Sequence, residues 1–423
     1  MKKELLRFLR GGGQWVHKRI RGQRRRVLLD GGSFMHFDQY RTLVPAMLED
    51  PRLEVCITSS WGEDMTEAQL FEAARRLGLH ERSVVPYARA KWQRWDVYLE
   101  TCFDNPWLMW PCPRVDIFHG VAEKYVPEED RLYMVHPLAR TCDILCCPNT
   151  RLKQGFDAHA DFLKPEAVVD VTGLSRQDCL VWSAGDGRLR DAVLGTLGLA
   201  PDKPTMLFAP TYGEGGLLHE WGEQILEYLA GMESYNVIVK LHPCSLMLTN
   251  DRFAAGIDWE GRVAAHTAGA SHMRHLLDWD IMELLCIADV LIGDFGSTAI
   301  DFAVTGKPVL FYRSRAQRDA LCGHDTQWTM LMNCCYDFDS MDGFIAHFEE
   351  ISAVAVEGAG AGERQHAIDV LRDAYHPHMG EATLRTLRRV YRRMGLVEPQ
   401  GITENAKPAL AHVFASLREG ESR

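Results

Sequence analysis

Short apolar runs alternate with helical stretches along most of the chain. Each run ends in glycine, proline or a polar residue, as in "RRVLLDGG" and "DVLIGDFG". The pattern predicts strands at 25–32, 53–60, 114–120, 142–149, 205–212, 235–243, 289–296 and 307–312. Between them, apolar residues return at helical spacing. This alternation is typical of α/β proteins whose parallel sheets are covered by helices on both faces.

Two segments of the first half are less regular. The run "ERSVVPY" at 81–87 predicts a further strand. The segment "AKWQRWDVYLETCF" at 90–103 predicts a helix, because Trp92, Trp95 and Leu99 would lie on one side of it.

The length of the chain predicts two domains. At 423 residues the chain exceeds the size at which one hydrophobic core stops growing, roughly 250–300 residues. The Gly- and Pro-rich stretch at 180–203 marks the boundary. We therefore predict one domain at 27–185, a second at 200–385, and C-terminal helices at 386–423.

Composition predicts an intracellular protein. No window approaches the ~18 consecutive apolar residues of a membrane span. The N-terminus lacks the apolar segment of a signal peptide. We therefore expect the twelve cysteines, which show no CxxC spacing, to be reduced and mostly buried.

Charge is concentrated at the N-terminus. Residues 1–26 carry ten Lys or Arg and one acid, which gives this arm +9 and leaves −20 on the rest of the chain. The acidic body argues against a nucleic-acid partner. The arm fits an anionic membrane surface, at up to ~1 kcal/mol per basic residue, and a solvated tail is the equally weighted alternative.

Polar side chains gather where the predicted strands end. Ligands of doubly wound sheets bind beyond the carboxyl ends of the strands, so these residues form the candidate site. They are His119 and Gly120, Thr211, Lys240 and His242, and Asp294, Gly296, Ser297 and Thr298.

The turn "GDFGST" predicts a phosphate site. Gly296 lets a ligand approach the backbone, and the hydroxyls of Ser297 and Thr298 would face the same point as the first amides of a helix. The alternative for Ser297 or Thr298 is an ordinary helix N-cap. The polar residues at the other strand ends favour the phosphate.

Two histidines at strand ends, one in each half, predict a division of roles. A diphosphate between the halves needs hydrogen-bonding partners on one side and a proton acceptor for the attacking group on the other. His242 and His119 can share these roles. A metal held by His272 and His275, three apart on a predicted helix, has little support, and "DGGS" at 30–33 lacks a dinucleotide fingerprint.

These residues resemble a known family, the CDP-glycerol glycerophosphotransferases that build teichoic-acid-type polymers. The similar segments are "HGVAEK" (119–124), "VTGLSRQD" (171–178), "LFAPTYG" (207–213), "VIVKLHP" (237–243) and the block 278–312. Their order and spacing match, and the last block is the most specific.

The resemblance implies a GT-B fold, in which two Rossmann-like domains with parallel sheets face each other across a cleft and the C-terminal helices pack back on the first domain. It implies catalysis without a metal or other cofactor. The expected donor is CDP-glycerol or a related CDP-alcohol, and the expected acceptor is lipid-linked or polymeric. The expected location is the cytoplasmic face of the membrane.

The resemblance also implies roles for single residues. His119 would be the base and His242 would contact the donor diphosphate. The same diphosphate would be held by Thr211, Lys240, Asp294, Gly296, Ser297 and Thr298, with Asp294 fixing the turn. The cleft would be organised by Gly120, Lys124, Arg176 and Asp178.

Some positions depart from the family pattern and leave the donor open. "DFGS" replaces the usual Asp-Tyr-Ser-Ser, Phe118 replaces a tryptophan, Gly213 an arginine, and Ser175 a proline. CDP-ribitol and nucleotide sugars therefore remain alternatives to CDP-glycerol.

The predicted reaction is attack of an acceptor hydroxyl on the β-phosphorus of a CDP-alcohol, with release of CMP. One rival is a GT-B glycosyltransferase or a UDP-GlcNAc 2-epimerase-like enzyme, for which Glu214 or Glu283 could bind a sugar ring. A second rival is a catalytically idle nucleotide-binding scaffold.

Overall fold

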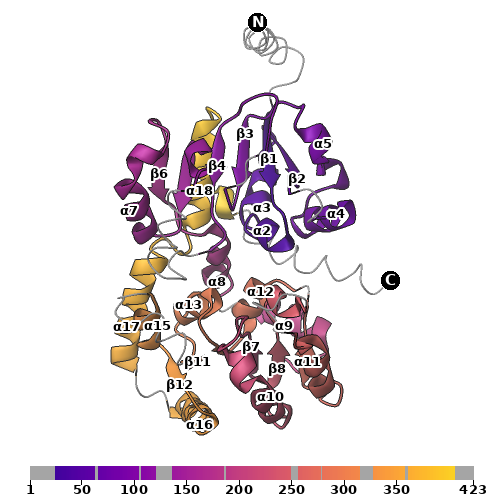
Figure 1. Cartoon of the computed structure of the whole chain (residues 1–423), viewed down its shortest axis with the longest axis vertical. Coiled ribbons are helices and arrows are strands. Elements are labelled where there is room, and N and C mark those ends of the chain that lie inside the picture. The colour runs from indigo at the N-terminus through magenta and orange to yellow at the C-terminus, as the bar shows by residue number, and fades with distance from the viewer. Residues whose placement is uncertain are drawn as a thin grey trace, which may run out of the picture.

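The chain forms two α/β domains, shown one above the other in Figure 1 with α8, α12 and α13 between them. The computed structural model describes residues 24–61, 65–103, 106–120, 136–184, 187–248, 256–277, 279–314, 327–357 and 361–404. Each domain contains a sheet of six parallel strands. Within the described part of the chain, no helix combines the length and apolarity needed to cross a bilayer.

The first sheet has the order β2-β1-β3-β4-β5-β6. Its strands are β1 (Arg25–Asp30), β2 (Leu53–Thr58), β3 (Val97–Glu100), β4 (Arg114–Asp116), β5 (Ile144–Cys147) and β6 (Val168–Val171). The helices of this domain are α2 (Phe34–Asp38), α3 (Leu43–Leu48), α4 (Glu67–Arg76), α5 (Tyr87–Ala90), α7 (Thr150–Ala158) and α8 (Asp178–Trp182). Val27, Leu28 and Leu29 of β1 are all fully buried, so both faces of the sheet are covered.

The second sheet has the order β12-β11-β10-β7-β8-β9. Its strands are β7 (Thr205–Phe208), β8 (Asn236–Val239), β9 (Met273–His275), β10 (Val290–Gly293), β11 (Val309–Tyr312) and β12 (Tyr336–Phe338). The associated helices are α9 (Gly187–Leu197), α10 (Leu217–Ala230), α11 (Trp259–Thr267), α12 (Ile281–Ile287), α13 (Ser297–Ala303), α15 (Gln327–Met332), α16 (Met341–Glu357) and α17 (Ala361–Tyr375).

The strand order locates the edge where a ligand is expected in each domain. In the second sheet the order reverses between β7 and β10, and in the first it reverses between β1 and β3. Ligands of such sheets bind beyond the carboxyl ends of the strands at these switch points.

The local predictions for 81–87 and 90–103 are wrong. The predicted helix overlaps α5 only at Ala90, and it contains β3, which pairs with β1 and β4 in the middle of the sheet. The predicted strand is a 3₁₀ turn, Glu81–Ser83, followed by an isolated bridge between Ile57 and Val84. The predicted helix around His272 and His275 is also wrong, because it is the edge strand β9.

The last helix, α18 (Ala382–Arg393), packs on the first domain, beside β4 and β6 in Figure 1. Its Leu387, Val390 and Tyr391 join the same buried cluster as Val27 and Leu29 of β1. The chain thus passes to the second domain after α8 and returns after α17.

The two connections between the domains touch each other. The indole N–H of Trp182, at the end of α8, donates to the carbonyl of Gly380 at 3.1 Å. Gly380 has a φ of 92° and packs against Val181. A side chain there would be strained and would meet Val181, so glycine suits this crossing.

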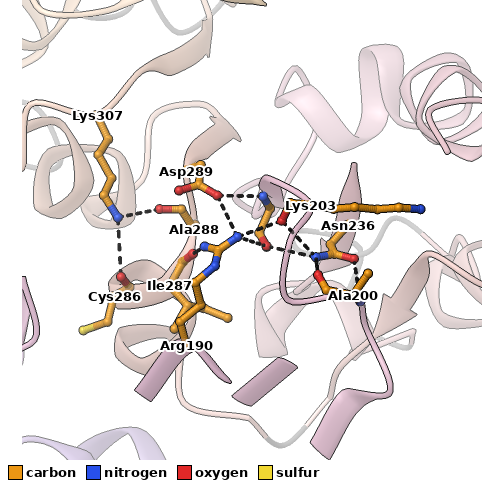
Figure 2. A network of polar contacts seen from close by, with 10 residues as sticks. Arg190, Ala200, Lys203, Asn236, Cys286, Ile287, Ala288, Asp289 and Lys307 are labelled. Atoms are coloured by element: carbon orange, nitrogen blue, oxygen red, sulfur yellow. Dashed lines mark hydrogen bonds and ion pairs between the residues drawn. The ribbon is translucent and has the colours of Figure 1, made fainter. Parts of the chain in front are cut away.

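A polar network at the amino ends of the strands fixes α9 on the second domain (Figure 2). Arg190 donates to the carbonyl of Ile287 at 2.6 Å and pairs with Asp289 at 3.0 Å. Lys307 donates to the carbonyl of Ala288 at 2.7 Å. These bonds satisfy carbonyls that the C-terminus of α12 leaves unpaired. The network is therefore structural, and it lies at the edge opposite to the polar strand ends.

Candidate active site

The end of α2 with the turn after it contacts the start of α12 through buried ion pairs between the two domains. Arg41, in the turn after α2, reaches the carboxylate of Asp280 at 3.1 Å and also pairs with Glu283. Asp38 lies 3.2 Å from the same guanidinium. All four side chains are buried. Glu283 is thus engaged between the domains, and Glu214, the other acid considered for a sugar ring, is exposed.

His119 lies in the loop after β4, and its ring orientation is fixed by the neighbouring strand end. Its Nδ1 lies 2.9 Å from the carbonyl oxygen of Thr101, which follows β3. A carbonyl can only accept, so Nδ1 carries the proton and Nε2 of the neutral ring keeps its lone pair. The side chain is half-buried. His119 therefore has the tautomer of a general base.

Asp116 holds the two loops that carry His119 and Thr101. Its carboxylate accepts the backbone N–H of Phe103 at 2.9 Å and that of Phe118 at 2.7 Å. Phe103 and Phe118 have φ values of 51° and 57°, in the left-handed region that costs a bulky residue free energy. Burial raises the pKa of Asp116 to about 7, against the effect of the two N–H donors.

His36 lies beside His119 and was not predicted from the sequence as a site residue. Its ring lies 5.5 Å from that of His119 between centroids, edge to face, and 5.0 Å from the ring of Trp61. The backbone N–H of Gly32 donates to its Nδ1 at 3.2 Å. Burial, and then the charge of His119, lower the pKa of His36 to about 4. The available signal was its position just after the "DGGS" turn, at the switch point of the first sheet.

On the second sheet, Asp294 ties the end of β10 to the loop after β7. Its carboxylate accepts the N–H of Thr211 and that of Leu217, each at 2.7 Å. Burial raises the pKa of Asp294 to about 6. The carboxylate is turned to these backbone donors, so Asp294 shapes the turn.

The turn beyond Asp294 leaves its helix start partly exposed. Gly296, not Ser297 or Thr298, is the N-cap of α13, and it has no side-chain cap bond. The alternative interpretation, an N-cap by the hydroxyl of Ser297 or Thr298, is therefore wrong, because these are the first two residues of the helix itself. A Cβ built on Gly296 would have Thr211 as its nearest neighbour, at 3.8 Å. The loop after β7 and the start of α13 thus border one space.

His242 follows β8 with the opposite tautomer. The N–H of Cys244 donates to its Nδ1 at 3.1 Å. Nδ1 is therefore unprotonated in the neutral ring, and Nε2 carries the hydrogen. The ring contacts that of Tyr212, with centroids 4.5 Å apart. Tyr212, which the sequence analysis did not select, places His242 beside the loop that carries Thr211.

Other predicted residues have structural partners. Lys240 is buried, and its ammonium donates to the carbonyl of Leu277 at 2.7 Å. Asp178 accepts from the N–H groups of Gly380 at 2.6 Å and Thr383 at 2.7 Å, so it holds the start of α18 on the first domain. Arg176 is half-buried in the 3₁₀ turn just before Asp178.

Gly120 and His272 lie in different surroundings. Gly120 is half-buried next to His119, with open space where a Cβ would be. Lys124 lies outside the described residues. Nε2 of His272 donates to the carbonyl of Leu229 at 3.2 Å, and the side chain is buried in the second domain.

Two Rossmann-like domains joined in this way define the GT-B class, and comparison with solved structures confirms it. The wall teichoic acid polymerase TagF superposes with a TM-score of 0.62 at 16% identity, covering 88% of this chain and 89% of that chain. The UDP-GlcNAc 2-epimerase of Neisseria meningitidis gives a TM-score of 0.52 at 12% identity, covering 86% of this chain and 100% of that chain.

Sequence comparison shows a similarity to one family. Residues 119–318 match the family model described as CDP-glycerol:poly(glycerophosphate) glycerophosphotransferase. This match, over just under half of the chain, confirms the resemblance that the motifs indicate. It begins at His119 and includes every predicted diphosphate-binding residue.

Curated relatives agree over shorter stretches. The teichoic acid glycerol-phosphate primase of Bacillus subtilis is 26% identical over 114 residues, which is 26% of each chain. The teichoic acid ribitol-phosphate polymerase TarK of Staphylococcus aureus is 27% identical over 167 residues, 37% of this chain and 29% of the relative. The matched region thus spans about a quarter to a third of the length of these relatives.

Proposed function

We propose that the chain transfers a polyol phosphate unit, such as glycerol phosphate, from a CDP-alcohol to a hydroxyl of a lipid-linked or polymeric acceptor, in the synthesis of a cell-surface polymer. The family match supports this reaction class, and the names of the relatives include both glycerol-phosphate and ribitol-phosphate enzymes. One TagF structure was obtained from a histidine-to-asparagine variant with CDPG. CDP-glycerol is therefore the first donor to test.

The observation that carries the proposal is the opposite tautomers of the two histidines. His119 directs its protonated nitrogen to the Thr101 carbonyl and keeps a lone pair on Nε2. His242 accepts the Cys244 N–H on Nδ1 and keeps a proton on Nε2. One ring is thus prepared to accept a proton and the other to donate a hydrogen bond, as deprotonation of an acceptor hydroxyl and stabilisation of a diphosphate require.

The proposed step follows from these roles. Nε2 of His119 takes the proton of the acceptor hydroxyl as its oxygen attacks the β-phosphorus. The bond from that phosphorus to the bridging oxygen breaks, and CMP leaves with the electron pair. The Nε2–H of His242, the hydroxyl of Thr211 and the first amides of α13 hold the charge that develops on the phosphoryl oxygens. Lys240, whose ammonium bonds to the carbonyl of Leu277, adds a buried positive charge to the second domain.

We also propose a peripheral position at the cytoplasmic face of the membrane, with the basic arm as the contact. Residues 1–23 of this arm lie outside the described residues, so its charge is the supporting observation. Pelleting with vesicles of anionic and neutral lipid, with and without residues 1–23, tests it. If both forms pellet equally with anionic vesicles, the arm is not the membrane contact.

Release of CMP from CDP-glycerol by the purified full-length chain tests the reaction. CDP-ribitol, UDP-GlcNAc and UDP-glucose serve as alternative donors, each with and without a lipid-linked acceptor. His119→Ala should lose most of the turnover while donor binding stays near that of the parent, whereas His242→Ala should weaken donor binding. His366→Ala, at an exposed histidine of α17, is the matched control.

Each rival has its own outcome in this assay. Epimerisation or cleavage of a UDP-sugar without CMP release from any CDP-alcohol would replace the proposed reaction with that of the epimerase-like rival. Nucleotide binding without turnover of any donor would support the idle scaffold. Unchanged turnover in His119→Ala would remove that residue as the base.

A further inference from the structure

We propose that His36, Cys102 and His119 form a binding site for one zinc-type divalent ion, and that the bound ion inhibits the chain by occupying the base nitrogen of His119. The second half of this statement rests on the proposed function, whereas the binding site does not. The ion is an inhibitor here, not a cofactor.

The three side chains converge from three different strand ends. His36 follows β1, Cys102 follows β3 and His119 follows β4, so they meet at the switch point of the first sheet. One ligand atom of each lies within 4.8 Å of those of the other two. His36 is buried, and Cys102 and His119 are half-buried, so the cluster has a protein wall and an approach from solvent.

The residue types select the ion. Two imidazole nitrogens and a thiolate suit Zn²⁺ and its transition-metal neighbours, whereas Mg²⁺ and Ca²⁺ prefer oxygen ligands. Around tetrahedral zinc, with bonds of about 2.0–2.3 Å, such atoms lie about 3.3–3.8 Å apart. Shifts of about 1 Å or less would therefore bring the three atoms to coordination distance. Three protein ligands leave a fourth position for water.

The contact of His119 with Thr101 already has the form found around bound metals. Ligating histidines almost always donate their other ring N–H to a carbonyl or carboxylate, which fixes the ring and the tautomer. Nδ1 of His119 makes this bond at 2.9 Å. Its Nε2 is therefore oriented for a metal by the same contact that prepares it as a base.

His36 sets a limit on affinity. A metal at its Nδ1 would displace the N–H of Gly32, and a metal at Nε2 would move the ring proton to Nδ1, facing that N–H. Either arrangement loses the 3.2 Å hydrogen bond. We therefore expect reversible binding that is weaker than that of a structural zinc site.

Inhibition follows from competition for one lone pair. Nε2 of His119 cannot hold a metal ion and accept the proton of the acceptor hydroxyl at the same time. Binding would also release the thiol proton of Cys102 to solvent, because the thiolate is the ligand.

The test uses the full chain and two titrations. Co²⁺ should produce a thiolate-to-metal charge-transfer band with the parent, and this band should be absent in Cys102→Ser. Calorimetry with Zn²⁺ should give one site per chain, weakened at least about 10-fold in His36→Ala and in Cys102→Ser. Cys112→Ser, in the same domain, is the control and should bind both ions as the parent does.

Inhibition is read in the CMP-release assay. Zn²⁺ should inhibit the parent and Cys112→Ser equally, and the inhibiting concentration should rise at least about 10-fold in Cys102→Ser, whose turnover without Zn²⁺ should match the parent. Absence of the Co²⁺ band and of Zn²⁺ binding in the parent overturns the site, even if turnover is never observed. Binding without inhibition of an active parent overturns the inhibitory role alone.

Discussion

The carboxylate of Asp116 accepts the backbone N–H of Phe118 at 2.7 Å, one residue before His119. Its other oxygen accepts the N–H of Phe103, two residues after Thr101. One buried side chain thus holds both loops whose contact orients the proposed base. The left-handed backbone at Phe103 and Phe118 is retained because both N–H groups point to this carboxylate.

We expect Asp116→Asn to impair catalysis through the position of His119. Asparagine offers one acceptor oxygen, so one of the two loops loses its bond, and a misplacement of 1 Å can cost about 100-fold in rate. Turnover in the CMP-release assay should fall by about 10- to 100-fold, with the donor KM close to that of the parent.

Asp143→Asn is the matched control, because Asp143 accepts the N–H of Arg114 at 2.9 Å in the same sheet without contacting these loops. An equal fall in both variants, or a raised donor KM in Asp116→Asn alone, would contradict a positioning role.

Gly296→Ala should separate ligand binding from folding. A Cβ at Gly296 would make only ordinary contact with Thr211 at 3.8 Å, and the φ of −120° is available to alanine. The midpoint of thermal unfolding should therefore change little, while the methyl group enters the space assigned to the donor diphosphate. Calorimetric titration with CDP-glycerol should show weaker binding. Unchanged affinity for CDP-glycerol would show that the diphosphate does not bind at this turn.

Arg41→Met should destabilise the contact between the domains. The variant leaves Asp38, Asp280 and Glu283 buried without the guanidinium that neutralises them, and removing one partner of a buried ion pair typically costs 3–5 kcal/mol. Denaturant unfolding should show a loss of about this size. The control, Arg75→Met, breaks a partly exposed pair with Glu72 and should cost under about 1 kcal/mol. Similar small losses in both variants would show that the buried cluster contributes little.

Asp294→Asn should change the pH dependence of stability between pH 4 and 6. Burial raises the pKa of Asp294 from 3.8 to about 6 in the folded chain, so the native state binds more protons than the unfolded state in this range. The stability contributed by this carboxyl is therefore greatest below pH 4, and it is lost as the pH rises to about 6. Asparagine does not titrate.

Unfolding free energies measured across this range should thus show the variant gaining on the parent as the pH rises, and a constant difference above pH 6. The shift of about 2 pKa units sets an upper limit of about 3 kcal/mol on this change. Asp202→Asn, at an exposed carboxylate, controls for the loss of an acid. A difference between parent and variant that stays constant from pH 4 to 6 would show that Asp294 is charged throughout this range in the folded chain.

The alternation of elements, and hence the fold, could be predicted because most strands are short apolar runs that end in glycine, proline or a polar residue. β10 is a buried apolar run that ends at Gly293 and is followed at once by Asp294. The edge strands β6, β9 and β12 were missed, because they are short and their sequences carry charged or polar residues such as Asp170 and Arg274.

The segment 90–103 shows the limit of periodicity. Trp92, Trp95 and Leu99 have helical spacing, but a strand buried on both faces has no polar alternation and resembles a buried helix segment. The segment forms the strand β3 because it pairs with β1 and β4, and the pairing with β1 joins residues far apart in the chain.

The candidate site was predictable only in part, for the same reason. His119, His242 and Asp294 stand out because each follows a strand. His36 and Arg41 do not, because their partners in the structure lie far along the chain, in the loop of His119 and in α12. The only local signal for His36 was its position just after the "DGGS" turn, and the sequence contains none for the contact of Arg41 with the second domain.

The crossing in which Trp182 donates to Gly380 makes the two interdomain connections a single mechanical element. Two adjacent segments that are bonded to each other resist bending and twisting more than a single segment does. One of these two segments, the one that contains Gly380, comes from near the C-terminal end of the described chain. A truncation before Gly380 would therefore remove one partner of this paired connection together with α18, and the first domain would lose part of its own core.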